Sequence, residues 1–339
     1  MNRETGFWRQ HPAWLAALPR PVPAELSTPR EVAAFEAESY AESCGGTTPA
    51  FRFVCEEALG EGYILEQSEP GTVTIRGGST GLLYGTYEAI SDLVCSCSLP
   101  AGLQRPACAK RMLDCWDNTD GSVERGYAGR SIWFEGGAFS YNPDRIRQMG
   151  RMLASAGINV LCINNVNVDP TARTLIGALL PETAEFARLL RPFGVRLMLS
   201  IDFASPMFSD DPDAEGQEQR LSSADPLDEE VCRWWQRCAA RVYRAIPDLA
   251  GFLVKAEPVI KTIFRLDRGQ FFFHLFVQLL QSLFDCLYPH KGVSVCIRFY
   301  LRSVNEQSFK VDLAHIRKLL NELIKQIFGV PAHIVLKKP

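Results

Sequence analysis

Polar side chains follow four of the strands predicted in this 339-residue sequence, each at the point where its strand ends. They are Glu135, residues 164–167, residues 202–206 and residues 255–257. In an eight-stranded α/β barrel the carboxyl ends of the strands build the active site, and an open doubly wound sheet also binds its ligand there. We therefore expect carboxylate, amide and ammonium groups from these segments to contact a ligand at one edge of the sheet.

A second candidate is the run from residue 111 to residue 130, which reads RMLDCWDNTDGSVERGYAGR. Neither helix nor strand propensity accounts for so many Trp, Arg, Gly and carboxylate residues in one segment. Asp117 and Asn118 are common turn formers, and Arg125 could pair with Glu124 on the surface. Direct contact with a substrate is an equally good interpretation of each residue, so the residues alone leave both open.

Residues 77–81, with the sequence GGSTG, precede a predicted helix, and their backbone N–H groups could bind a phosphate. Their spacing matches neither the dinucleotide-binding G-x-G-x-x-G motif nor the P-loop, and the P-loop lysine is absent. We therefore predict a tight turn from strand to helix in which Ser79 or Thr80 caps the helix.

Strands and helices alternate from about residue 130 onward. Strands are predicted at residues 131–135, 160–166, 195–203 and 251–256, and helices at residues 143–156, 174–190 and 228–246, with an interruption at Pro181. This alternation implies right-handed βαβ units around a buried parallel sheet.

The first part of the chain predicts a smaller α/β domain. Thr28, Pro29 and Glu31 have the spacing of a capping box with proline at the first helical position, so a helix should run from Pro29 to about residue 43. Runs rich in Val, Ile, Phe and Tyr predict strands, and a second helix follows residue 81. The predicted strands are residues 51–55, 62–66 and 72–76.

The composition is that of a globular chain, with 47% hydrophobic residues, 22% charged residues and a net charge of −3. This near neutrality disfavours nucleic acid and anionic membranes as partners. We expect no secretory signal and no membrane span, because the first residues lack an apolar run and no window of about 18 residues is uncharged and apolar. Eleven cysteines scattered singly through apolar contexts predict reduced, buried thiols and a cytoplasmic location.

The composition changes after Glu257. Residues 258–339 hold 12 Lys and Arg against 5 Asp and Glu, whereas residues 1–257 hold 24 against 34. We expect a domain boundary or a foreign segment there. That tail could fold, because residues 292–301 predict a strand, and residues 312–327 predict an amphipathic helix for its own domain or for a partner.

The run at residues 111–130 resembles the WDN…DGSxERGYAGxS stretch of the bacterial α-glucuronidases of glycoside hydrolase family 67. The resemblance continues in order through GIN at 157–159, NNVN at 164–167, FASP at 203–206, ADPLD at 224–228, WW at 234–235 and GFLVKA at 251–256. It covers about residues 5–257. It implies an α/β chain with an N-terminal α/β domain at residues 1–110, the first half of a TIM (β/α)8 barrel at residues 111–257, and an unmatched tail at residues 258–339.

The same resemblance implies that glucuronic acid, or its 4-O-methyl ether, is removed from xylo-oligosaccharides with inversion. It implies a glucuronoxylan-derived oligosaccharide as the partner and neither cofactor nor metal, and it leaves a homodimer open for full-length members. A uronate-binding lysine would be Lys255, an aromatic surface for the sugar Trp133, and a polar contact Asn165. Trp133 suits the protein core equally well.

The chain departs from the family after that lysine. The family's general acid lies four residues beyond it, where this chain has Val259. Glu257 is the carboxylate that could replace it, although Pro258 restricts the backbone there. The catalytic base has no recognisable counterpart in the tail. We therefore expect a truncated α-glucuronidase, from a frameshift or a chimeric gene, that is weak or inactive; the alternative is a non-catalytic carbohydrate-binding fragment.

Overall fold

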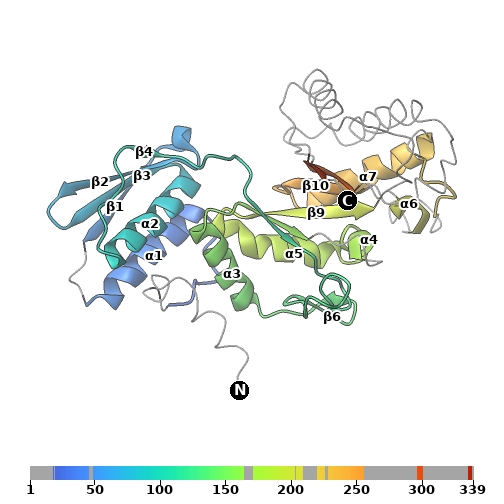
Figure 1. Ribbon diagram of the computed structural model, residues 1–339, viewed down its shortest axis with the longest axis horizontal. Coiled ribbons are helices and arrows are strands. Elements are labelled where there is room, and N and C mark those ends of the chain that lie inside the picture. Colours follow the sequence, from blue (N-terminus) through green and yellow to red (C-terminus); the bar gives the residue numbers. More distant parts are fainter. Residues whose placement is uncertain are drawn as a thin grey trace. The chain divides into compact units, whose positions relative to one another are not determined.

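The structure, a computed structural model, describes residues 18, 20–45, 49–163, 171–202, 204–208, 220–225, 228–255, 296–300 and 335–337 (Figure 1). The chain divides into two compact units. Unit 1 consists of Met1–Leu113, Ser140–Leu161 and Glu185–Arg196, and unit 2 of Asp114–Phe139, Cys162–Ala184 and Leu197–Pro339. The predicted domains, with bounds at residues 110 and 257, follow a different division and stay a prediction.

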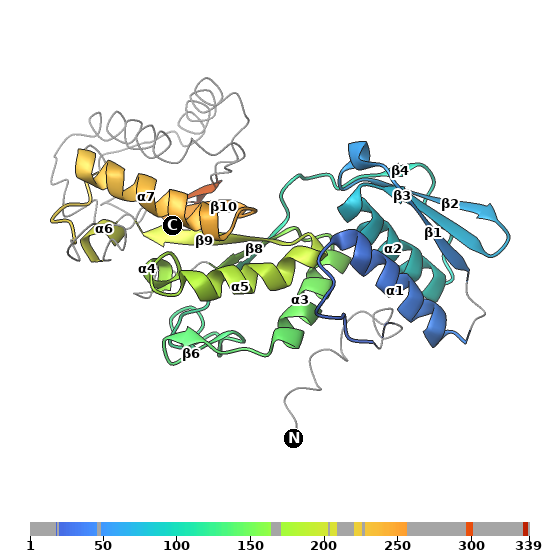
Figure 2. The same cartoon turned by 180° about the vertical axis from the view of Figure 1, so that it is seen from behind.

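Unit 1 contains a four-stranded sheet with the strand order β1-β3-β2-β4. The strands are β1 (Ala50–Cys55), β2 (Tyr63–Glu69), β3 (Thr72–Gly77) and β4 (Leu103–Gln104), and a short 3-10 helix (Glu57–Leu59) precedes β2. β1 and β3 are parallel, whereas β2 is antiparallel to β3 and β4. Helices α1 (Pro29–Ser43) and α2 (Ser79–Val94) lie together against this sheet (Figure 2). The helices and strands predicted for this part of the chain are thus confirmed.

The capping box predicted at the start of α1 is confirmed. The Glu31 N–H donates to Thr28 Oγ1 at 3.3 Å, and the Thr28 N–H donates to Glu31 Oε2 at 2.9 Å. Ser27 donates to the same carboxylate from its backbone N–H and from its hydroxyl. These bonds, that of the Ser27 N–H first, lower the pKa of Glu31 because they favour the ionised carboxylate.

The glycine-rich turn before α2 differs from its prediction. Gly78 is the N-cap residue, and no side chain caps the helix, so the prediction of a Ser79 or Thr80 cap is wrong. A Cβ atom at Gly78 would overlap the carbonyl oxygen of Gly60, and the Gly81 N–H donates to that same oxygen at 3.3 Å. The glycines are therefore needed for close contact between two backbones, and a carbonyl oxygen lies where a phosphate would have to bind.

This geometry predicts unequal effects of two substitutions in one turn. Gly81→Ala should lower the free energy of unfolding by about 1–3 kcal/mol, because its new methyl group would overlap the backbone of Gly62. Ser79→Ala should change it by less than about 0.5 kcal/mol, because a serine that makes no capping bond has none to lose. Urea unfolding followed by circular dichroism measures both. Equal losses in the two variants would show that the Ser79 side chain does cap the helix.

Helix α3 (Pro143–Ser155) is the third helix of unit 1 and agrees with its prediction. Asn142 caps it, because the Asn142 Oδ1 accepts from the Asp144 N–H at 2.8 Å. Gly150 brings this helix close to the ring of Phe193, which belongs to a short 3-10 helix (Arg191–Phe193), and a Cβ atom at Gly150 would overlap that ring.

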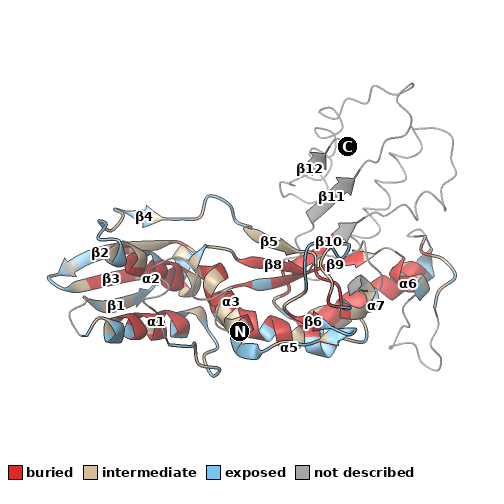
Figure 3. Ribbon diagram, turned by 60° about the horizontal axis from the view of Figure 1, so that its bottom comes forward, coloured by how far each residue is buried: buried red, intermediate tan, exposed pale blue. Residues whose placement is uncertain are grey.

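A six-stranded sheet has the order β12-β11-β10-β9-β8-β5, and unit 2 holds most of its residues. The strands are β5 (Met112–Cys115), β8 (Val160–Ile163), β9 (Arg196–Asp202), β10 (Gly251–Lys255), β11 (Cys296–Tyr300) and β12 (Val335–Lys337). The pairs β9–β10, β10–β11 and β11–β12 are all parallel. All four residues of β8 are buried, as a strand covered on both faces requires (Figure 3).

Four helices accompany this sheet along the chain. They are α4 (Thr171–Leu175), α5 (Leu180–Leu190), α6 (Ser205–Phe208) and α7 (Glu229–Ala245). The helical segment is interrupted as predicted, but the break lies at residues 176–179 and not at Pro181. Pro181 lies in the first turn of α5, where its missing N–H costs no bond. Alternating helices and parallel strands are confirmed, whereas closure into half of a barrel stays a prediction. Among the described residues, no helix is both long enough and apolar enough to cross a bilayer.

The strand predicted at residues 131–135 is the clearest correction. The strand that lies next to β8 is β5, and β6 (Phe134–Glu135) pairs instead with β7 (Ala138–Phe139) in an antiparallel hairpin. Gly136 and Gly137 connect β6 to β7 with φ angles of +61° and +88°, the left-handed conformation of a two-residue hairpin turn. The apolar residues before this turn therefore belong to the hairpin.

The tail contributes β11 and β12 to the six-stranded sheet. β11 confirms the strand predicted at residues 292–301 and pairs in parallel with β10, through Leu253 with Cys296 and Val254 with Ile297. The amphipathic helix predicted at residues 312–327 lies outside the described residues.

Candidate functional site

The loop that follows β5 buries polar residues. Asp117, Asn118 and Thr119 are only 7%, 1% and 4% exposed. The Asn118 side-chain amide donates to Ser122 Oγ and to the Glu124 carbonyl oxygen, both at 2.8 Å. Asn118 therefore holds the loop in shape, which is the turn interpretation of the two that its sequence left open.

Glu124 lies in the same loop with an unusual backbone conformation. Its φ angle is +57°, in the left-handed region that favours glycine. Its N–H donates to the Trp116 carbonyl oxygen at 2.7 Å, and its own carbonyl oxygen accepts from Asn118. Hydrogen bonds on both sides of the residue thus hold this conformation in place.

Trp133 follows this loop and is only 2% exposed. The backbone N–H groups of Trp133 and Phe134 donate to Ser131 Oγ at 3.3 and 3.1 Å. Trp133 directly precedes β6. The sequence predicts Trp133 in the first strand of the parallel sheet. That prediction is wrong, because Trp133 lies outside the six-stranded sheet. Its burial favours the core interpretation over an open face for a sugar, and its role in binding stays a prediction.

Two carboxyl groups of this loop have pKa values shifted in opposite directions. Burial raises the pKa of Asp117, against a hydrogen bond from the Ser131 side chain. The pKa of Asp120 is lowered instead, because the Ser122 hydroxyl and N–H donate to Asp120 Oδ1 at 2.6 and 2.8 Å. A buried carboxyl with a raised pKa keeps its proton to a higher pH than an exposed one does.

These shifts predict opposite pH dependence of stability. Because the folded chain holds the Asp117 proton more tightly than the unfolded chain, the contribution of Asp117 to the free energy of unfolding falls as pH rises above about 4. The contribution of Asp120 is present above about pH 4 and is lost as pH falls through its lowered pKa. From about pH 3 to 7, Asp117→Asn should therefore gain stability relative to the wild type, whereas Asp120→Asn should lose it. Urea unfolding across this range measures both, and parallel profiles would contradict the assignment.

An ion pair lies at the carboxyl end of β9. Asp202, the last residue of the strand, accepts at Oδ2 from Arg173 Nη2 at 3.0 Å and from Nε at 3.3 Å. Its other oxygen, Oδ1, accepts from the Ala204 N–H at 3.0 Å. Both charged side chains are mostly buried, at 15% and 20% exposed. The Arg173 guanidinium also lies 4.1 Å from the centre of the Phe208 ring.

Lys255 is the last residue of β10, and its Cα is paired in register with that of Asp202. The backbone of the predicted uronate-binding lysine therefore lies next to that of Asp202, at the carboxyl ends of two parallel strands. Glu257, Val259 and Asn165 lie outside the described residues, so their roles stay predictions. Sequence reasoning found Asp202 and Lys255 through their places at strand ends. It missed Arg173 and Phe208, whose positions within helical patterns carry no such signal.

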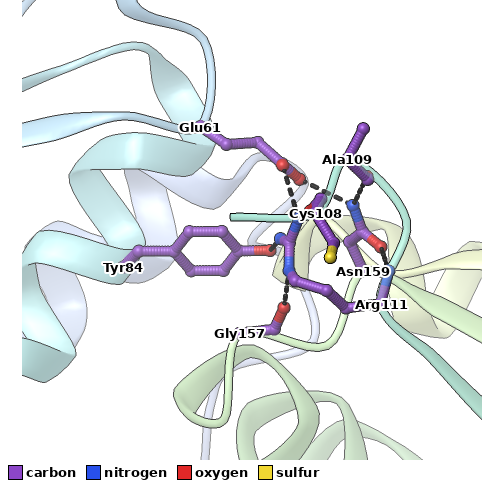
Figure 4. Close-up of polar contacts among 7 residues, drawn as sticks. All are labelled: Glu61, Tyr84, Cys108, Ala109, Arg111, Gly157 and Asn159. Carbon is purple, nitrogen blue, oxygen red and sulfur yellow. Dashed lines mark hydrogen bonds and ion pairs between the residues drawn. The ribbon is translucent and has the colours of Figure 1, made fainter. Parts of the chain in front are cut away.

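A second polar cluster, in unit 1, fixes the start of β5 (Figure 4). Arg111, directly before β5, donates to Glu61 Oε2 at 2.9 Å, to the Tyr84 hydroxyl at 3.1 Å and to the Gly157 carbonyl oxygen. Asn159 accepts from the Arg111 N–H at 2.9 Å and donates to Glu61 Oε1 at 3.0 Å. Burial, and then the charge of Glu61, raises the pKa of Tyr84 to about 12. Arg111, Gly157 and Asn159 belong to the segments that resemble the family. They hold the start of β5 in place and do not lie at the carboxyl ends of β9 and β10.

Comparison with known proteins adds the family. Residues 97–262 match the glycosyl hydrolase family 67 middle domain. An α-glucuronidase of Hypocrea jecorina is 35% identical over 302 residues, which cover 85% of this chain and 32% of that protein. The α-glucuronidase A of Aspergillus tubingensis is 36% identical over 321 residues, 90% of this chain and 35% of that protein. This chain thus spans about a third of the length of the curated relatives it matches.

A solved structure shares the fold. It is a GH138 enzyme targeting pectin rhamnogalacturonan II, with a TM-score of 0.54 and 12% identity over 91% of this chain and 37% of that one. The matched middle domain and these relatives place the chain among the glycoside hydrolase families. The chain is an α-glucuronidase-like member of glycoside hydrolase family 67.

The match to the A. tubingensis protein shows whether the similarity stops at the change of composition after Glu257. It takes in 90% of this chain, which is more than residues 1–257 could supply. That similarity therefore extends into the tail, which also contributes β11 and β12 to the sheet.

Proposed function

We propose that this chain carries part of the active site of an inverting α-glucuronidase, which removes glucuronic acid or its 4-O-methyl ether from xylo-oligosaccharides. One observation carries the proposal: the matched middle domain, residues 97–262, includes β5, β8, β9 and β10, whose carboxyl ends carry the polar residues described above. Glycosidases of the α/β-barrel type bind their substrates at such strand ends. The named relatives support the choice of glucuronic acid.

Binding of the uronate requires a cation, and we assign that role to Lys255. A hydrogen bond from an ammonium group to a carboxylate is among the stronger polar contacts in proteins. The register of β9 and β10 supports this assignment, because it puts Lys255 at the strand edge beside Asp202. In the same proposal Asn165 contacts sugar hydroxyls, and Trp133 either faces the sugar or supports the loop that does.

Turnover requires two carboxyl groups. In inverting glycosidases an acid protonates the leaving oxygen, and a base about 6.5–9.5 Å away activates water. We propose Glu257 as the acid, because Val259 occupies the family's position for it. A displaced acid should make the chain a weak hydrolase. This expectation rests on Val259 and holds wherever the natural protein begins or ends.

The remaining sequence-based expectations are proposals of the same standing. We propose that the parallel strands are the first part of a TIM barrel and that the protein acts in the cytoplasm on soluble oligosaccharides released from glucuronoxylan. The nine cysteines within the described residues are free thiols, which supports that compartment. The prediction that they are buried is wrong for Cys55, Cys95, Cys97 and Cys108, which are exposed.

Hydrolysis of aldobiouronic acid, in which 4-O-methylglucuronic acid is linked to one xylose, tests the proposal. We expect release of the uronic acid at a rate about 10²–10⁴ below that of a full-length family member, the range that general acid–base assistance supplies. Glu257→Gln should reduce the remaining rate at least about tenfold, within that same range. Glu185→Gln is the matched control, because Glu185 is an exposed carboxylate paired only with its helical neighbour Arg188 in the contacts described.

Three outcomes of this experiment are informative. Equal rates in the wild type and Glu257→Gln would remove Glu257 from the mechanism. A rate equal to that of a full-length enzyme would contradict the importance of Val259. Binding without any release, in protein shown to be folded by circular dichroism, would replace the hydrolase with the carbohydrate-binding alternative.

The uronate-binding role predicts a specific loss of affinity. Lys255→Ala should weaken binding of glucuronic acid by about 1.5–3 kcal/mol, the worth of a hydrogen bond to a charged group. Lys325→Ala, a lysine in the predicted tail helix, should leave affinity unchanged. Isothermal titration calorimetry compares the two variants, and equal losses would exclude Lys255 from the site.

A further inference from the structure

Phe208 exposes a large aromatic surface beside the strand ends. It closes α6, the short helix that follows the end of β9, and is 48% exposed. Its ring contacts the Arg173 guanidinium at 4.1 Å from the centroid. An aromatic side chain that exposes nearly half of its surface forgoes burial that would stabilise the fold. What distinguishes Phe208 is its contact with an arginine that pairs with Asp202 at the end of β9.

Several contacts fix the orientation of this ring. Asp202 holds Arg173 through Nη2 and Nε, and the Ala204 N–H holds Asp202 in turn. The planar guanidinium then lies against the Phe208 ring, an arrangement that lysine cannot reproduce. Because these groups are already ordered, a ligand that stacks on the ring loses less free energy to side-chain ordering.

The charge of the Arg173–Asp202 pair indicates which class of ligand could bind beside Phe208. Arg173 and Asp202 neutralise each other, so these two side chains add no net charge beside Phe208. The cation for the uronate is Lys255, which comes from the neighbouring strand β10. A xylose ring presents an apolar face of C–H groups and a rim of hydroxyls. An aromatic ring can cover the first, while neighbouring polar groups can reach the second.

We propose that Phe208 is a stacking surface for a neutral xylose of the oligosaccharide, with Arg173 and Asp202 as positioning residues. This inference rests on the proposed function and extends it, because it separates the binding of the xylose chain from the binding of the uronate at Lys255. The chain then recognises the unbranched part of its substrate through Phe208.

Calorimetric titration of the full chain with xylotriose tests this inference, because xylotriose has no uronate. Phe208→Ala should weaken binding about 3- to 10-fold, the worth of one aromatic stacking contact. Phe208→Trp should retain the wild-type affinity within about twofold, since it restores an aromatic face. Arg173→Lys should weaken binding while leaving the charge unchanged. Leu103→Ala, at a residue 44% exposed on β4, is the matched control and should bind as the wild type does.

The outcomes separate this inference from the hydrolase proposal. Equal affinity in the wild type and Phe208→Ala, an equal loss in Leu103→Ala, failure of Phe208→Trp to restore binding, or no binding of xylotriose to the folded wild type would each overturn the stacking surface. Release of uronic acid from aldobiouronic acid, measured on the same preparations, judges the hydrolase independently. Aromatic-dependent xylotriose binding without release would support the stacking surface and reject the hydrolase.

Discussion

A buried ion pair between Glu36 and Arg151 is the interaction on which unit 1 depends. Glu36 on α1 is fully buried, and the Arg151 side chain on α3 is 6% exposed. Arg151 Nε and Nη2 each donate to one carboxylate oxygen at 2.6 Å, and the Tyr87 hydroxyl on α2 donates to Glu36 Oε1 at 2.9 Å. Removing one partner of such a pair leaves an uncompensated buried charge, at a cost of about 3–5 kcal/mol. Burial, and then the charge of Glu36, raises the pKa of Tyr87 well above its usual value.

The polar cluster around Arg111 in unit 1 follows from this ion pair step by step. It holds α3 against α1 and α2, and α3 leads directly to Gly157 and Asn159. Those two residues hold Arg111, and Arg111 fixes the start of β5. The loop that buries Asp117 follows β5 directly. A polar cluster inside unit 1 thereby fixes the start of β5.

The sequence predicted what local patterns determine. The capping box of α1, the break before α5 and the order of strands and helices all follow from residues within a few positions of one another. Two expectations failed for the opposite reason. The turn at Gly78 depends on Gly60, and the hairpin formed by β6 and β7 competes with the strand expected at residues 131–135. The pairing of Glu36 with Arg151 joins residues more than a hundred positions apart, which no local pattern reveals. At the site, strand ends identified Asp202, Lys255 and Glu257, whereas the roles of Lys255 and Glu257 came from the resemblance.

The left-handed residue in the loop after β5 has a consequence for how that loop moves. A non-glycine residue in this conformation carries an intrinsic cost of about 1–2 kcal/mol, which neighbouring bonds offset only while they persist together. Losing the bond from Asn118 to Glu124 removes part of that compensation and so weakens the bond to Trp116. The loop should therefore open as one cooperative segment, with its amide hydrogens exchanging at a common rate, and each opening would uncover the buried Asp117 carboxyl to solvent in a single event.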